Sequence, residues 1–163
     1  MPVVSNTSPI LNLAIINRLD LLRQQFGEVI IPTAVLSELK LDSEFPGVDT
    51  LRQALQAAWI HSVEVKNAYV VRALRLELDH GESEAIALAL ELDLKQVLMD
   101  ERDGRMIAKA MGVTPVGVLG ILLQAKREGN VDSVKSAMQK LEQEAGFYIA
   151  PDLFTTLLRE ADE

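Results

Sequence analysis

Short runs of β-branched residues alternate along the chain with longer segments in which apolar residues recur every three or four positions. The longer segments predict helices with one apolar face. The short runs predict buried strands at residues 3–4, 29–31, 62–65, 96–99 and 114–116. Strands that alternate with helices in this way are typical of a parallel sheet covered on both faces. The pattern therefore predicts an α/β fold.

The 163 residues are the length of one ordinary domain, and we expect residues 131–163 to pack as a helical extension of it. The N-terminus has neither the basic start nor the apolar stretch of a signal peptide. The longest nearly apolar run, 116–125, is far shorter than the roughly 20 residues that cross a bilayer. We therefore expect a cytoplasmic protein without a membrane segment.

Polar residues follow the predicted strands, and ligands of open parallel sheets bind at the carboxyl ends of the strands. Four separate segments bring acids, amides or hydroxyls toward this edge. They contribute Asn6, Thr7 and Ser8 after the first strand, Glu38 after the second, Glu82 and Glu84 before the fourth, and Asp100 and Asp103 after it.

Each of these residues also has an ordinary structural interpretation. Ser8 before Pro9 is a good helix cap, and acids such as Glu82 in a first helical turn are favoured by the helix dipole. Asp100 with Asp103 resembles a capping pair, and Glu38 fits a solvated helix face.

Taken together, converging carboxylates repel one another unless a cation compensates their charge. The chain has no cysteine, and neither His61 nor His80 has a histidine partner at ligand spacing. An oxygen-only ligand set favours Mg²⁺ or Mn²⁺ over zinc.

Several segments, distributed over nearly the whole chain, resemble the PIN-domain nucleases, and in particular their small VapC-type toxins. These are residues 3–14, 18–22, 26–32, 81–89, 98–105, 117–126 and 146–149, together with Leu153. The resemblance implies a three-layer α/β/α sandwich with a short parallel sheet, and a metal-dependent ribonuclease held by a cognate antitoxin protein.

The resemblance also assigns candidate site residues. The family's acids fall on Asn6, Glu38, Glu82 (with Glu84 as a rival) and Asp100, which would be both catalytic residues and ligands of Mg²⁺ or Mn²⁺. Asp103 is an auxiliary acid, and Thr7 and Ser8 lie where the family often has a hydroxyl. Asn6 departs from the pattern, because an amide oxygen can ligate a cation but brings no charge.

Two functions therefore stay open. In the first, the chain is an endoribonuclease whose Arg102 and Arg105 bind the phosphates of RNA, although these arginines also fit an ordinary solvated helix face. In the second, Asn6 marks a catalytically impaired module that acts in protein–protein interaction. A receiver domain is disfavoured because no lysine directly follows the fifth strand, and dinucleotide binding because no strand precedes a Gly-x-Gly-x-x-Gly motif. Apolar stripes in segments 51–58 and 70–78 fit either a homodimer face or the core.

The net charge of the chain bears on how it could bind nucleic acid. With 24 acidic and 16 basic residues the formal net charge is −8, which disfavours a broad basic footprint for nucleic acid. If some of the acids bind a divalent cation, its positive charge offsets theirs, and an RNA phosphate can still approach the metal site. The sequence therefore predicts RNA contact that is bridged by metal and weak without it.

Overall fold

The computed structural model describes all residues, 1–163, and has one central sheet. Five parallel strands lie in the order β3-β2-β1-β4-β5. Their bounds are Val3–Ser5 (β1), Val29–Pro32 (β2), Ile60–Val63 (β3), Gln96–Leu98 (β4) and Thr114–Val116 (β5). The α/β prediction is confirmed. The chain runs outward from β1 through β2 to β3 and then crosses back to β4, so the sheet has its topological switch point between β1 and β4.

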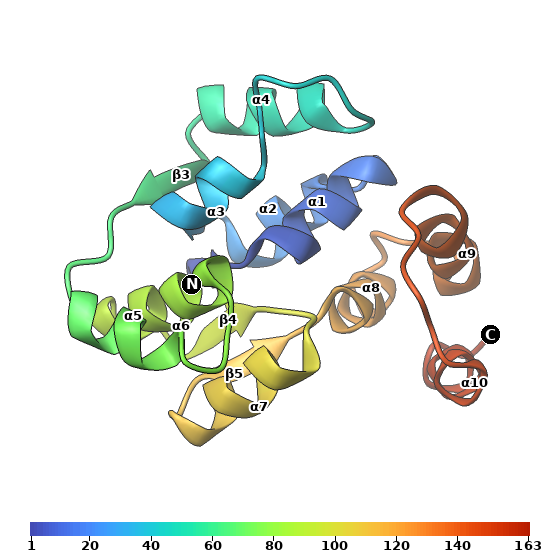
Figure 1. The fold of residues 1–163 in the computed structure, drawn as a ribbon. Coiled ribbons are helices and arrows are strands. Elements are labelled where there is room, and N and C mark those ends of the chain that lie inside the picture. The colour runs from blue at the N-terminus through green and yellow to red at the C-terminus, as the bar shows by residue number, and fades with distance from the viewer.

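Helices cover both faces of the sheet, which makes three layers (Figure 1). One face packs against α5 (Ala68–Leu74), α6 (His80–Glu91) and α7 (Arg102–Ala110). The opposite face is covered by α1 (Thr7–Ile15), α2 (Asp20–Phe26), α3 (Thr33–Glu38), α4 (Val48–Gln56), α8 (Val118–Arg127), α9 (Val134–Glu144) and α10 (Pro151–Glu160).

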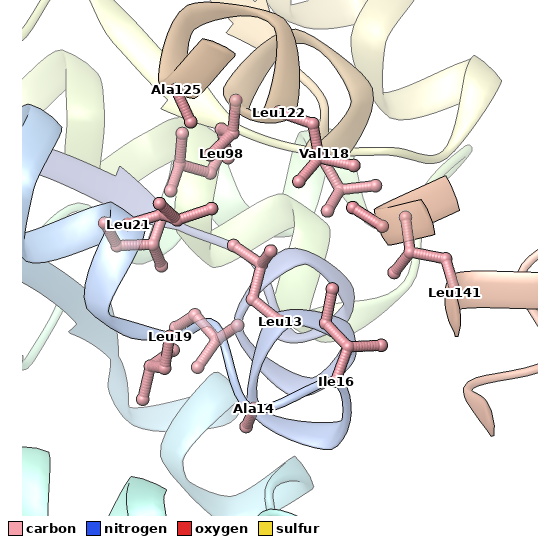
Figure 2. Close-up of a cluster of buried hydrophobic side chains, with 14 of the residues drawn as sticks. Leu13, Ala14, Ile16, Leu19, Leu21, Leu98, Val118, Leu122, Ala125 and Leu141 are labelled. Carbon is pink, nitrogen blue, oxygen red and sulfur yellow. The ribbon is translucent and has the colours of Figure 1, made fainter. Parts of the chain in front are cut away.

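Successive strand residues point into opposite cores, as the period of two of a strand requires. In β1, Val3 belongs to the larger core and Val4 to the smaller one. Likewise Leu98, the last residue of β4, belongs to the larger core, and Met99, which follows it, to the smaller one. Figure 2 shows part of the larger core, where Leu98 from the sheet lies among side chains of α1, α8 and α9. Both faces of the strands are therefore buried, which explains their continuous apolar sequence.

The C-terminal segment completes the larger core. Leu141 of α9 is fully buried, and Ile149 and Leu157 are nearly so. All three belong to the same apolar cluster as the residues of α1 and α8. Figure 1 shows α9 and α10 beside α8, at the end of the molecule away from α4. No helix in the chain combines the length and apolar character that a membrane crossing requires.

Two local predictions were wrong. The third strand begins at Ile60, two residues before the predicted start, because Ile60 pairs with Val29 and Val63 pairs with Pro32. The first helix begins at Thr7, so Asn6 and not Ser8 occupies its N-cap position. That shift places the side chain of Asn6 at the junction of β1 and α1.

Candidate active site

Asn6 and Asp100 lie next to each other at the switch point of the sheet. Ser5 of β1 is paired with Leu98 of β4, and the backbone N–H of Asn6 donates to the carbonyl of Leu98 at 2.9 Å. The register therefore delivers Asn6 and Asp100 to the carboxyl edge from adjacent strands. Asn6 is only 4% exposed although its side chain is polar.

One oxygen of each of these side chains is buried and has no hydrogen-bond donor. They are Oδ1 of Asn6 and Oδ2 of Asp100. A buried oxygen without a partner is costly, and native proteins keep few of them. Two such acceptors at one sheet edge indicate a place where a cation or a substrate donor is expected.

The other oxygen of Asp100 is fixed by the start of α8. Oδ1 accepts the backbone N–H of Val118, the first residue of that helix, at 2.8 Å. Asp100 therefore caps α8, which corrects the prediction that it pairs with Asp103 to cap α7; the N-cap of α7 is Glu101, without a side-chain bond. A Cβ on Gly117 would lie 2.8 Å from Oδ1, so this close approach requires glycine.

Burial raises the pKa of Asp100, and the Val118 N–H, the nearby charge of Arg105 and the hydroxyl of Ser8 offset part of that increase. The arginine is held in place because its Nη1 donates to the carbonyl of Met99 at 2.9 Å. A carboxylate in these surroundings gains free energy from any further positive charge.

Glu38, the last residue of α3, is connected to the start of α1. The hydroxyl of Thr7 donates to its Oε2, so two predicted site residues from distant parts of the chain are in contact. A Cβ on Gly81 would lie 2.6 Å from the same oxygen. The carboxylate thus packs directly on the backbone at the start of α6.

Glu82 is the third acid that packs on a glycine. It is 7% exposed, and a Cβ on Gly104 of α7 would lie 2.7 Å from its Oε2. Burial raises the pKa of Glu82 to about 8, and the carboxyl of Asp79 and the charges of Glu101 and Asp103 act in the same direction. Glu82 is therefore largely protonated at neutral pH when no cation is bound.

Glu84, the rival of Glu82, uses its oxygens elsewhere. One accepts the backbone N–H of Ala34 at 2.9 Å, and the other lies 3.2 Å from Nε2 of His80. The contact with Ala34 joins α6 to α3, whereas His80 belongs to α6 itself. The geometry therefore favours Glu82 as the acid available for a ligand.

Asp103 and Arg102 approach Glu82 from the start of α7. All three line an open cavity of about 330 Å³, whose wall also includes Asp79 and Glu101. No three carboxylate or imidazole groups in the chain converge closely enough to form a ready-made metal centre. The predicted ligand acids Glu38, Glu82 and Asp100 are therefore not gathered into one coordination sphere.

The donor set nevertheless fits a hard divalent ion. Carboxylate and amide oxygens are the ligands that Mg²⁺ prefers, and Mg²⁺ needs only one or two protein carboxylates. Asn6 and Asp100 offer two oxygens of this kind that have no other partner. The fit rests on these two atoms.

The chain matches one known protein family over almost its whole length. A family model described as PIN domain matches residues 2–163. The chain belongs to the PIN-domain family. No curated protein and no solved structure matches the chain. PIN domains are generally nucleases, which are hydrolases that bind RNA and use divalent metal ions.

The sequence alone did not identify the three glycines of this PIN domain against which carboxylates pack. Gly81, Gly104 and Gly117 each leave no room for a Cβ: an oxygen of Glu38, Glu82 or Asp100 lies there, and at Gly104 the sulfur of Met99 lies closer still. The only signal in the sequence is that two of them stand inside or at the start of helices, where glycine is otherwise disfavoured.

We expect a pH dependence of stability that originates at Glu82. Its pKa is higher in the folded protein than the ordinary value of 4.5, so the folded state binds more protons than the unfolded state. In EDTA the free energy of unfolding should therefore fall as pH rises from about 4.5 to about 8. Glu82→Gln should remove most of this decline in denaturant titrations, whereas Glu142→Gln, on an exposed position, should not. An equal decline in wild type and Glu82→Gln would contradict the assignment.

Proposed function

We propose that this PIN domain is a metal-dependent endoribonuclease and the toxin of a toxin–antitoxin pair. The observation that supports the proposal most is the pair of buried, unpartnered oxygens on Asn6 and Asp100 at the switch point of a PIN-domain sheet. In a PIN domain this is the edge where a divalent ion and a phosphate are needed.

In this proposal Asn6, Glu38, Glu82 and Asp100 hold Mg²⁺ or Mn²⁺, and Asp103 assists from the start of α7. A bound divalent ion supplies an activated water and stabilises the negative charge that develops on the phosphate and the leaving oxygen.

Contacts within the protein hold the proposed metal ligands in position. Asp100 keeps Oδ2 free because Oδ1 is bound to the N–H of Val118. Thr7 holds Glu38 through its hydroxyl. Glu82 releases its proton when it becomes a ligand, so metal affinity should rise with pH below about 8.

In this proposal Arg102, Arg105 and Ser8 contact phosphate, and Thr7 can join them only by releasing Glu38, to which its single O–H donates. Both arginines are on α7, the helix that directly follows Asp100. The guanidinium of Arg105 uses Nη1 for the carbonyl of Met99, which leaves its other donors for a phosphate oxygen.

The wider role of the chain follows from the resemblance. We propose an RNA substrate, an antitoxin segment that covers the active-site edge, and a cytoplasmic location. A homodimer is supported by α5 and the turn after it, because Tyr69 and Leu76 are 79% and 84% exposed there although both are large and apolar.

A second candidate function rests on Asn6 alone. An amide in place of the first acid lowers the formal charge of the site, and a PIN domain altered in this way can serve as a protein-interaction module without cleavage. Metal binding separates the two functions, because a ligand that binds only the native state must raise its melting temperature.

The experiment is a cleavage assay on structured RNA with Mg²⁺ or Mn²⁺ and with EDTA as the control. The wild-type chain is measured beside Asn6→Asp and Asp100→Ala, with Asp42→Ala as a matched loss of an exposed acid. Cleavage by the wild type supports the nuclease. Cleavage by Asn6→Asp only would show that Asn6 silences the site, and no Mn²⁺-dependent rise in melting temperature would favour the interaction module.

Gly81→Ala tests whether the position of Glu38 matters. The added methyl would lie 2.6 Å from Oε2 of Glu38, so the carboxylate must move, whereas alanine itself suits a helix better than glycine. We expect an unchanged or higher melting temperature together with cleavage reduced about ten-fold or more. Gln139→Ala, at an exposed helical position of α9, is the control. Unchanged cleavage in Gly81→Ala would exclude a role for Glu38 in its present position.

A further inference from the structure

A groove leads away from the candidate active site toward the C-terminal segment. It has a volume of about 500 Å³ and begins at Asp100 and Arg105. Its lining includes Gly117 and Gly120 at the start of α8, and Phe147 and Tyr148 from the segment between α9 and α10. This volume falls within the range of about 300–1,000 Å³ that is typical of small-molecule sites.

We propose that this groove binds a nucleobase of the RNA next to the cleaved phosphate, and that Tyr148 is its stacking residue. The inference rests on the proposed ribonuclease function and adds a base-binding subsite to it. Asp100 and Arg105 line the groove as well as the candidate active site, whereas Tyr148 is not among the candidate catalytic, metal-binding or phosphate-binding residues.

Tyr148 has the properties of a stacking platform. It is 81% exposed, and its hydroxyl makes no hydrogen bond within the chain. An exposed aromatic ring that lines a groove offers a flat apolar face, and stacking of a base on such a ring is tolerant of sequence. The core does not need this ring, because the neighbouring Ile149 fills the interior instead.

The glycines keep the floor of the groove flat. Gly117 cannot carry a side chain because Asp100 lies against it, and Gly120 is exposed, with only Val116 near its Cβ position, at 3.7 Å. Without side chains at these two positions, a planar ring can approach the backbone of α8 closely.

The charges at the mouth of the groove favour RNA over an apolar protein segment. Asp100 belongs both to the groove and to the candidate metal site, and Arg105 offers unused donors beside it. The rest of the lining is uncharged. An occupant that combines an anionic group at the mouth with a flat apolar body inside therefore matches the groove, and a nucleotide has this combination.

Substitutions at two positions test the subsite without disturbing the candidate catalytic residues. Tyr148→Ala removes the ring, and Tyr148→Phe keeps it. Gly120→Leu fills the groove, and its first side-chain atom meets only Val116 at 3.7 Å. Leu90→Ala, which removes an exposed apolar side chain of α6 that does not line the groove, is the control.

The measurement is the affinity of full-length protein for fluorescein-labelled RNA tetranucleotides by anisotropy, with Ca²⁺ as the divalent ion. We expect Tyr148→Ala and Gly120→Leu to weaken binding about ten-fold or more, and Tyr148→Phe and Leu90→Ala to stay within about two-fold of wild type. Unchanged melting temperatures would show that the variants are folded.

Equal affinity in all variants, or no RNA binding by the wild type, would overturn the proposal. Equal affinity is also the result expected if the groove receives a side chain of a protein partner. Cleavage with Mg²⁺ and Mn²⁺ is measured separately. If binding depends on Tyr148 while neither wild type nor Asn6→Asp cleaves RNA, the subsite stands and the ribonuclease function fails.

Discussion

Asp100→Asn should lower metal-dependent RNA cleavage by at least about a hundred-fold while the protein stays folded. Asparagine keeps an oxygen for the N–H of Val118, so the cap of α8 is preserved. It removes the charge from the side chain whose Oδ2 is buried without a partner, and a cation there loses a carboxylate ligand. The measurement is the cleavage rate in Mn²⁺ together with the melting temperature.

Without metal, Asp100→Asn should leave the stability of the protein unchanged or raise it. Burial raises the pKa of Asp100, so the charged form is less favourable in the folded state than in the unfolded chain. In EDTA at neutral pH, Asp100→Asn should therefore melt at the same temperature as wild type or higher. Asp42→Asn, at an exposed position, should change neither property. Cleavage near the wild-type rate in Asp100→Asn would show that Asp100 is not a metal ligand.

Asn6→Asp should raise metal-dependent cleavage about ten-fold or more. The new carboxylate replaces an amide that is 4% exposed and whose Oδ1 has no hydrogen-bond donor. Without metal, two neighbouring buried carboxylates repel each other and the protein should melt at a lower temperature than wild type. With Mn²⁺ the order of melting temperatures should reverse, because the added charge strengthens ion binding to the native state.

Asn130→Asp adds the same charge at an exposed position and is the matched control. It should leave cleavage and the response to Mn²⁺ unchanged. Lower stability in Asn6→Asp both with and without Mn²⁺, combined with unchanged cleavage, would mean that position 6 has only a structural role.

The fold was predictable because its signals are local. The apolar runs at residues 29–31 and 96–99 are long enough to mark buried strands, and the helices between them follow a clear period. The start of β3 was missed because only the partner strand fixes it. Ile60 is a strand residue through its pairing with Val29, and the residue itself does not reveal that register.

The site was predictable only as a set of residue types at one edge of the sheet. Which oxygen is free depends on contacts between segments far apart in the chain. Asp100 caps α8 across 18 positions, and Glu84 is occupied by the N–H of Ala34 across 50. The groove beside Tyr148 forms only because the segment after α9 returns to the start of α8, and no local pattern indicates that return.

The most direct test of the central claim is the cleavage of structured RNA by the wild-type chain in Mn²⁺, in EDTA and with Asp100→Asn in Mn²⁺. A divalent ion held by the free oxygens of Asn6 and Asp100 predicts cleavage in the first condition and none above background in the other two. Cleavage that persists in EDTA or in Asp100→Asn, or its absence in Mn²⁺ from both wild type and Asn6→Asp, would contradict the claim.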